Sequence, residues 1–314
     1  MPEQINLVVN KDSKDLLSVG DAFLREYNFA VAQKCFEAFE PSDINDRRDV
    51  LARTLLLEGW QHKDRTQLSY SVDVLLSLSG LIKKYGLRGQ LFVGGFGLIS
   101  MNRTLGFLTD PRLLMLSEKY SHLLPISAWH WNLETVVWAI SHALHLPGDF
   151  VELGVFKGHT SRIMADYFDF SAIPKKWYLY DTFDGIPDDQ IDTDHWRTAN
   201  QVYKGTFSFE EVSNTFSDCE NMTVIKGRVP DILKDVCPSQ ISFLHVDMNN
   251  VEAEIEALKF LYDDRIVPGG VIIFDDYGWA VAEAQHIAAN QWADSKGLKI
   301  LELPSGQGLL MKPV

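Results

Sequence analysis

The sequence contains few cysteines and no apolar stretch long enough to span a membrane. Its three cysteines, Cys35, Cys219 and Cys237, are far apart and form no C-x-x-C pair. This spacing favours free thiols in a reducing compartment over a disulfide framework or a zinc site. The longest weakly polar run, Leu91 to Ile99, contains three glycines and is too short to cross a bilayer. Because residues 1–10 also lack a basic segment followed by an apolar core, we expect a soluble cytoplasmic protein.

An excess of basic residues is also missing. The 314 residues carry a formal net charge of −14, with 46% hydrophobic and 23% charged residues, as in a soluble globular protein. Residues 1–146 hold 15 Lys and Arg against 16 Asp and Glu, whereas residues 147–314 hold 14 against 27. The acidic half repels nucleic acids and anionic membranes, and it suits a cationic ligand such as a metal ion or a sulfonium.

One short stretch organises this acidic half. Residues 150–153 form an apolar run bounded by glycines, which is typical of a strand in the middle of an α/β sheet. Gly154 and Gly158 allow a tight turn after it, and Thr160 or Ser161 can cap the helix that follows. Such a strand, turn and helix let a nucleotide-bearing cofactor lie against bare backbone.

The third glycine of a pyrophosphate-binding turn is absent. The spacing here is E-x-G-x-x-x-G, formed by Glu152, Gly154 and Gly158, rather than G-x-G-x-x-G. This form, with two glycines, suits S-adenosylmethionine (SAM), which carries a sulfonium and no phosphate. A nicotinamide-dependent oxidoreductase is the second interpretation, and the motif alone also fits an ordinary tight turn.

Strands and helices alternate from Gly148 to the end of the chain. This alternation predicts a mostly parallel sheet with helices on both faces, and ligands at the carboxyl ends of the strands. Amphipathic helices are expected around residues 251–262 and 281–292, and Ser208 to Glu211 is a capping box. The further strands are expected at 177–180, 222–225, 241–246, 271–274, 299–303 and 309–311.

Residues 1–110 are expected to form a mainly helical region that selects the substrate, forms a homo-oligomer or docks a partner. Apolar residues recur at helical spacing from about 12 to 85, with separate helices around 50–60 and 70–85, and the glycine-rich stretch 86–97 is expected to be a loop or a boundary. Four residues match part of a tetratricopeptide unit, but a single repeat cannot bury its face, which favours a helical hairpin. Residues 111–314 would form the cofactor domain, where Trp129-His130-Trp131 is a core or interface element or a substrate platform.

Acids lie at the ends of four of the predicted strands, and Glu152 is near the end of the first. Asp181 ends the second strand, Asp247 the fourth, and Asp275 and Asp276 the fifth. Asp181 is placed to accept hydrogen bonds from ribose hydroxyls. If the last three converge, their repulsion requires a cation or protons, and oxygen ligands favour a hard ion such as Mg²⁺. Such an ion could hold a substrate hydroxyl and lower its pKa.

Several motifs in this order resemble the macrocin O-methyltransferase family over about residues 147–312. They are V-E-L-G-V-F-K-G at 151–158, Y-D-T-F-D-G-I-P at 180–187, K-G-R-V-P-D at 226–231, H-V-D at 245–247 and P-G-G-V-I-I-F-D-D-Y-G at 268–278. The resemblance implies a class I SAM-dependent fold, with Rossmann-like topology, and Mg²⁺-dependent methylation of sugar or natural-product hydroxyls. It implies that Asp247, Asp275 and Asp276 bind the metal and that Asp247 is the candidate general base. The implied cofactor-binding residues are Glu152, Gly154, Phe156, Gly158, Thr160, Asp181, Thr182 and Arg228.

The sequence departs from the family pattern after the fourth strand. The family continues as D-x-D-x-Y, whereas this chain has Asp247-Met248-Asn249-Asn250-Val251. Asn249 is interpreted as a cap of the next helix. The altered segment keeps two alternatives open, an N-methyltransferase and a non-catalytic methyltransferase-like binding protein.

The long acidic connection between Thr182 and Thr206 is predicted to be a lid over the site. His195 within it could act as an acid or base, although a solvated surface histidine is the simpler interpretation. His159 and His245 are interpreted as structural. The leading hypothesis is therefore a SAM- and Mg²⁺-dependent O-methyltransferase that acts on a hydroxylated small molecule.

Overall fold

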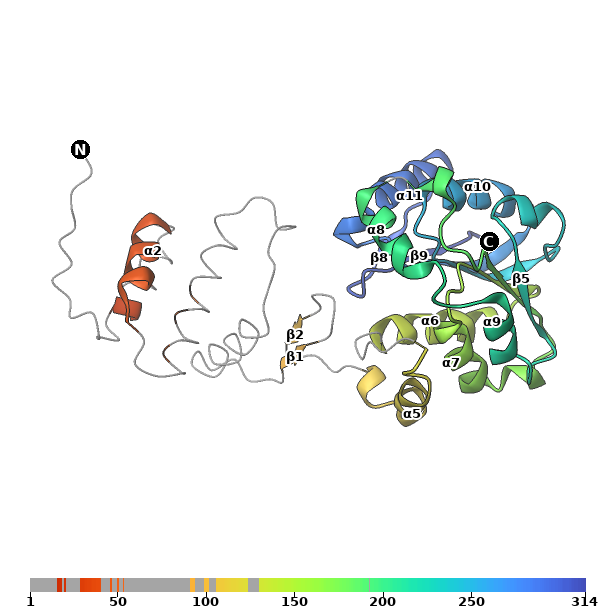
Figure 1. Ribbon diagram of the computed structural model, residues 1–314, viewed down its shortest axis with the longest axis horizontal. Helices are drawn as coiled ribbons and strands as arrows, with labels where there is room; N and C mark the ends of the chain where they lie inside the picture. Colours follow the sequence, from red (N-terminus) through yellow and green to blue (C-terminus); the bar gives the residue numbers. More distant parts are fainter. Residues whose placement is uncertain are drawn as a thin grey trace. The chain divides into compact units, whose positions relative to one another are not determined.

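The computed structural model describes most of the chain after residue 105. The described residues are 16–18, 20, 29–40, 46, 50, 53, 91–93, 99–101, 106–123, 130–191 and 193–314. The chain divides into two compact units, Met1–Val93 with Ile99–Thr104, and Gly94–Leu98 with Leu105–Val314. The second unit contains the sheet and its helices (Figure 1). The expected boundary at residue 110, and the roles proposed for the region before it, stay predictions.

The described part of the first unit contains one long helix and a small antiparallel pair. Helix α2 (Phe29–Ala38) confirms part of the expected helical region. Strands β1 (Leu91–Val93) and β2 (Ile99–Met101) pair with Leu91 opposite Met101. Residues 91–93 are therefore a strand and not a loop, because these apolar residues find a partner strand just beyond the glycines. The alternative expectation of a boundary within 86–97 agrees with the division of the units between Val93 and Gly94. The helices expected around 50–60 and 70–85 lie essentially outside the described residues.

The second unit is built on a seven-stranded sheet in the order β5-β4-β3-β6-β7-β9-β8. Strands β3 to β7 are parallel, and β9 runs antiparallel to both β7 and β8. This mostly parallel sheet confirms the predicted fold class. The strands are β3 (Asp149–Leu153), β4 (Trp177–Asp181), β5 (Met222–Lys226), β6 (Ile241–Val246), β7 (Ile266–Phe274), β8 (Leu301–Glu302) and β9 (Gly308–Met311).

Strand β7 begins earlier than the sequence predicts. It was expected at 271–274, after a turn at Pro268-Gly269-Gly270, but it starts at Ile266. Ile266 pairs with Ile241 of β6, and the register shifts before Phe243 pairs with Val271. The Pro-Gly-Gly segment is therefore an irregularity inside the strand, which the paired neighbour β6 holds in place.

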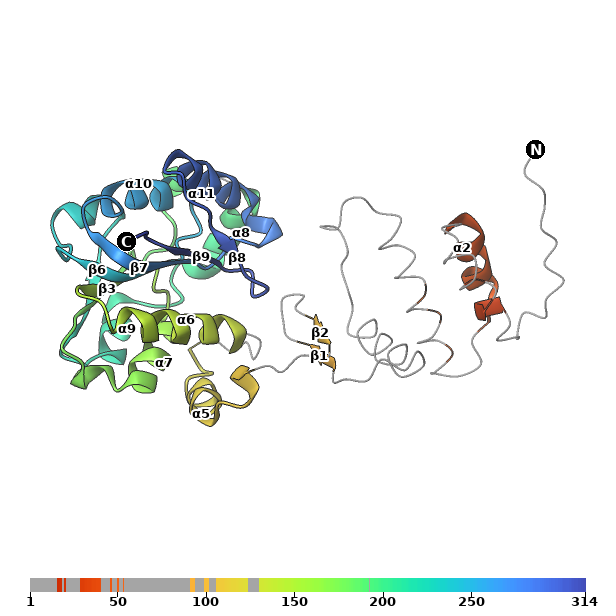
Figure 2. The same cartoon turned by 180° about the vertical axis from the view of Figure 1, so that it is seen from behind.

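Helices cover both faces of the sheet. Helices α6 and α7 lie on one face, and α10 and α11 lie on the other, as Figures 1 and 2 show from opposite sides. Ser208 and Glu211 form the predicted capping box at the start of α9. The helices are α5 (Pro111–Lys119), α6 (His130–Ala143), α7 (His159–Phe168), α8 (Asp194–Tyr203), α9 (Phe209–Thr215), α10 (Val251–Leu261) and α11 (Glu283–Ser295), with short 3-10 helices η2 (Gly106–Leu108), η3 (Phe170–Ala172), η4 (Asp188–Gln190), η5 (Asp231–Lys234) and η6 (Ala280–Ala282).

The core lies around the central strands. All six residues of β6 are buried, and the ring of Phe150 packs edge to face against Trp177 and Phe243 at centroid distances of 5.6 and 5.5 Å. Trp131 packs against Phe107 at 5.7 Å, which supports a packing role for this tryptophan. The three cysteines are free, as expected. Among the described residues, no helix is both long and apolar enough to cross a membrane.

Candidate active site

A cavity of about 600 Å³ opens at the carboxyl ends of β3, β4, β6 and β7. Strands that run parallel end at the same edge of the sheet, so the loops that follow them meet there. The cavity is lined by the turn after β3, the loop after β4, the acids after β6 and β7, and residues of α8 and η6. It therefore lies where the sequence predicts the ligand site.

The turn after β3 depends on two glycines. Gly154 has a φ of +88°, and a Cβ there would lie 1.8 Å from the carbonyl oxygen of Asp247. Gly158 has a φ of +78° and precedes α7, and a Cβ there would meet the ring of Phe216 at 2.7 Å. Both positions require glycine, because a side chain would be strained and would collide with neighbouring atoms. Gly154 also brings the turn into direct contact with the end of β6.

Asp181 organises this turn from the neighbouring strand. Its Oδ2 accepts hydrogen bonds from the backbone N–H groups of Val155 and Phe156, at 2.8 and 2.9 Å. Its Oδ1 accepts a third bond from the N–H of Phe183 at 2.8 Å. Three donors thus satisfy most of the carboxylate's hydrogen-bonding capacity within the protein. Asp181 faces the cavity, but it also holds the loops after β3 and β4 together.

The structure brings four of the eight predicted cofactor-binding residues to the cavity wall. These are Gly154, Phe156, Asp181 and Thr182. The other four, Glu152, Gly158, Thr160 and Arg228, do not line it. Gly158 and Thr160 lie at the start of α7, and Arg228 forms an ion pair with Asp189 at 2.7 Å. The role of each residue in binding the cofactor stays a prediction.

Glu152 lies beneath the cavity and not in its wall. The residue is 3% exposed, and its Oε1 lies 3.0 Å from Nδ1 of His245. The other ring nitrogen of His245 lies 3.3 Å from Oδ1 of Asp275. Burial raises the pKa of Glu152, and the hydrogen bond to His245 partly opposes that rise. Burial alone would lower the pKa of His245, but its hydrogen bonds to Asp275 and Glu152 raise it well above its usual value.

The three acids predicted to bind a metal do converge. One carboxylate oxygen from each of Asp247, Asp275 and Asp276 lies within 4.8 Å of the others. Burial and the charges of neighbouring acids raise the pKa of Asp247 and Asp276 well above the usual range. Oδ2 of Asp276 is buried and has no hydrogen-bond partner among the described residues. Buried carboxylates with too few donors need a cation or protons, so this donor set fits a hard divalent ion.

The predicted lid is an ordered segment with a helix of its own. The connection after Thr182 contains η4 and α8. Asn200 of α8 accepts a hydrogen bond from the N–H of Ile186 at 2.7 Å and donates to its carbonyl oxygen at 2.8 Å. His195 lines the cavity from this helix, but it is exposed. The segment therefore forms part of the cavity wall, and its movement as a lid stays a prediction.

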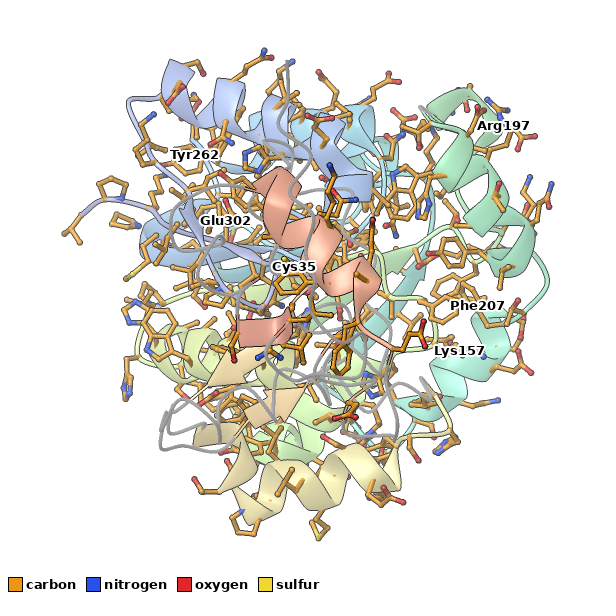
Figure 3. The ribbon with its side chains drawn as sticks, turned by 90° about the vertical axis from the view of Figure 1, so that its left-hand side faces the viewer. Cys35, Lys157, Arg197, Phe207, Tyr262 and Glu302 are labelled. Atoms are coloured by element: carbon orange, nitrogen blue, oxygen red, sulfur yellow. The ribbon has the colours of Figure 1, made fainter. Side chains whose placement is uncertain are left out.

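Three aromatic side chains pack together next to the turn after β3, and the sequence predicted a site role for Phe156 alone. The ring of Phe156 packs edge to face against Tyr203 and Phe207, at centroid distances of 5.6 and 4.6 Å. Figure 3 shows Phe207 and Lys157 on the same side of the domain. The signal in the sequence was the spacing of Tyr203, the last residue of α8, and Phe207 just beyond the helix, but nothing local tied them to Phe156. These three residues are called the aromatic wall below.

Asn249 does not cap α10. The cap is Asn250, whose side chain accepts a hydrogen bond from the N–H of Ala253 at 2.7 Å. Asn249 instead has a φ of +54° and lines the cavity. The prediction was wrong because the helix starts one residue later, which leaves Asn249 in a left-handed conformation that asparagine tolerates. The altered family motif therefore lines the cavity.

Comparison with known proteins places the chain in a family. The model of the macrocin O-methyltransferase family (TylF) matches residues 131–300, more than half of the chain. The structure of the O-methyltransferase NovP is similar at 21% identity, covers 58% of this chain and 80% of its own, and has a TM-score of 0.51. Calicheamicin methyltransferase CalS11 has 14% identity, coverages of 67% and 94%, and a TM-score of 0.43. SAH-bound PaMTH1 from Podospora anserina has 12% identity, coverages of 79% and 98%, and a TM-score of 0.44. A search of curated proteins gave no match.

The fold and the cavity define a class I methyltransferase, and the likeness to NovP supports that fold. The chain belongs to the macrocin O-methyltransferase family. It is therefore a SAM-dependent O-methyltransferase.

Proposed function

We propose that this enzyme transfers the methyl group of SAM to a hydroxyl of an apolar, hydroxylated natural product or its sugar, with Mg²⁺ held by Asp247, Asp275 and Asp276. The observation that carries the proposal is the convergence of these three carboxylates in one cavity, with Oδ2 of Asp276 buried and lacking a partner among the described residues. A Mg²⁺ ion bound there would hold the acceptor hydroxyl and lower its pKa.

The residues around the cluster support the transfer in three ways. The glycine turn leaves backbone exposed for the cofactor, and the acidic cavity attracts its sulfonium. Asp247 lines the cavity within the acid cluster, so we assign its carboxylate the role of proton acceptor for the hydroxyl. The hydroxyl oxygen bonds to the methyl carbon as the carbon–sulfur bond breaks, and the sulfur leaves as a neutral thioether.

The aromatic wall supports an acceptor with an apolar body. Phe156 and Phe207 present ring surface beside the cavity, and Tyr203 adds a hydroxyl to it. The charges of Asp247 and Asp276 act on Tyr203, which places its phenol on the side of the acid cluster. Burial, followed by these two charges, raises the pKa of Tyr203, so it stays neutral and can donate a hydrogen bond to the acceptor. An acceptor that combines a hydroxyl with a ring or polyketide body matches both surfaces.

The setting of the enzyme follows from its thiols and charge. The free thiols of its three cysteines support a cytoplasmic location, and its membership of the macrocin O-methyltransferase family supports a role in natural-product biosynthesis. Its net charge of −14 supports a small-molecule partner rather than nucleic acid or a membrane surface. We also propose that the region before residue 110 forms a homo-oligomer.

The test separates cofactor binding from metal dependence. Protein freed of metal with EDTA is titrated with SAM, S-adenosylhomocysteine and Mn²⁺ by calorimetry, and methyl transfer to a panel of hydroxylated glycosides and polyketides is measured with and without Mg²⁺. Asp276→Asn should weaken Mn²⁺ binding at least about 100-fold and leave S-adenosylhomocysteine affinity within about threefold, because it removes charge at the cluster alone. Asp184→Asn, an exposed acid near the cavity, is the control. Full turnover without any divalent ion would overturn the proposal.

A further inference from the structure

Asp275 is held by two side chains on one oxygen. Its Oδ1 accepts a hydrogen bond from Nε2 of Gln307 at 2.7 Å, and Nε2 of His245 lies 3.3 Å from the same atom. In the described part of the chain, no hydrogen bond reaches Oδ2 of Asp275. The two oxygens of this carboxylate therefore differ: one is engaged by the protein and the other is available to a ligand.

Gln307 reaches Asp275 through the pairing of two strands far apart in the sequence. Strand β9 runs antiparallel to β7, and Gly308 lies opposite Phe274. This register places Gln307, just before β9, beside Asp275, just after β7. Gln307 is fully buried, at 0% exposure, so its amide has no access to water. It also lies outside the residues that the family model matches.

The orientation of the Gln307 amide follows from its two partners. An ionised carboxylate only accepts hydrogen bonds, so the end that faces Asp275 must be the NH₂ group. The Oε1 end accepts a hydrogen bond from Oγ of Ser305 at 3.1 Å. Both ends of the amide are thus satisfied, and Gln307 is not among the residues that line the cavity.

His245 completes the support from the opposite strand. It is 2% exposed and lies between Glu152 on β3 and Asp275 after β7. The carboxylate of Asp275 is therefore held from two directions, by β6 through His245 and by the turn before β9 through Gln307. Side chains that hold a metal ligand in this way set its orientation.

We propose that Gln307, together with His245, is a positioning residue that engages Oδ1 of Asp275 and directs Oδ2 toward a divalent cation shared with Asp247 and Asp276. The inference rests on the proposed cation site. It assigns a role to the segment before β9, which the sequence presents only as a connection between two closing strands. It also predicts that Asp275 contributes one oxygen to the ion and not two.

The test measures cation affinity in the full-length protein with Mn²⁺ as the probe. Gln307→Met keeps the side-chain volume and removes this donor, so Asp275 is released from Gln307 and its Oδ1 keeps only the contact with His245. We expect the Kd for Mn²⁺ to rise about 10- to 100-fold, while the Kd for S-adenosylhomocysteine changes less than about twofold. The electron paramagnetic resonance spectrum of bound Mn²⁺ should also change, because a released Asp275 can bind through both oxygens.

A matched control separates positioning from general loss of packing. Gln285 is also buried and also donates to a carboxylate, Glu254, at 2.8 Å. Gln285→Met should cost comparable stability but leave the Kd for Mn²⁺ within about threefold. Gln307→Asn is the second variant if Gln307→Met does not fold, because its shorter side chain withdraws the donor and keeps an amide.

The outcomes distinguish this inference from the proposed function. Wild-type binding of Mn²⁺ that is weakened by Gln307→Met or Gln307→Asn, and not by Gln285→Met, supports the inference. Wild-type binding with unchanged affinity in both Gln307 variants overturns it and leaves the cation site standing. If the wild type binds no Mn²⁺, the proposed metal dependence fails and the inference fails with it.

Discussion

Asp181 and the acid cluster of Asp247 and Asp276 lie at the same edge of the sheet but differ in the hydrogen-bond donors around them. Asp181, after β4, accepts three backbone hydrogen bonds and ties two loops together. Asp247 and Asp276, after β6 and β7, have raised pKa values because they are buried beside other acids. An acid at a strand end therefore does not define its own role. An acid with several hydrogen-bond donors around it stabilises the fold, whereas a buried acid with too few donors is a candidate ligand-binding group.

Gly154 lies between the turn that Asp181 holds and the backbone of Asp247. We expect its substitution to have the largest effect on stability. Gly154→Ala places a Cβ 1.8 Å from the Asp247 carbonyl oxygen at a φ of +88°. We expect a loss of about 4 kcal/mol of stability, a fall of about 10 °C in Tm by calorimetry. Gly205→Ala is the control, because it has a similar φ of +75° with nothing within 4 Å, and it should cost about 1 kcal/mol. Equal losses in the two variants would show that the turn and the end of β6 do not depend on their contact.

The stability gained on cation binding should depend on the acid cluster and not on Asp181. Mn²⁺ at 100 times its Kd should stabilise the wild type by about 2.7 kcal/mol, because the ion binds the folded protein alone. EDTA should reverse the gain, and Asp276→Asn should abolish it while Asp181→Asn retains it. Thermal unfolding at matched ionic strength measures each case. A full gain in Asp276→Asn would remove the distinction between the two groups.

Asp166 extends the comparison to a satisfied acid on α7, away from the cavity. Burial would raise its pKa, but hydrogen bonds from Lys119, Tyr120 and Arg162 lower it to about 2. A lowered carboxyl pKa gives stability that is full above about pH 4 and is lost as pH falls toward 2, which amounts to about 2 kcal/mol. Urea unfolding from pH 6 to pH 2.5 should show this loss in the wild type and a shallower one in Asp166→Asn. Identical pH profiles of stability in the wild type and Asp166→Asn would contradict this role of Asp166.

The smallest expected effect concerns the cofactor. Asp181→Asn exchanges one acceptor oxygen for an NH₂ group among the N–H donors of Val155, Phe156 and Phe183. We expect the Kd for S-adenosylhomocysteine to rise about tenfold, because the turn loses a charge-assisted bond. Calorimetry measures this change, with the exposed Asp184→Asn as control. An unchanged Kd would show that Asp181 neither shapes the turn for the cofactor nor contacts it.

The sequence by itself determined the sheet and the place of its acids. Strand β6 matches the predicted residues 241–246 at both ends, because buried strands carry continuous apolar runs that local pattern reveals. Parallel strands end at one edge, so Asp247, Asp275 and Asp276 could be expected to meet before their positions were known.

Tertiary structure alone decided which groups surround those acids. The backbone donors to Asp181 come from a turn 25 and 26 residues away, and Gln307 reaches Asp275 across an antiparallel pair separated by 32 residues. The N-cap of α10 is likewise Asn250 and not Asn249, although both residues offer the same side chain in the sequence. Apolar periodicity is local and can be read along the chain, whereas a hydrogen bond between distant residues exists only once the strands that carry them have paired.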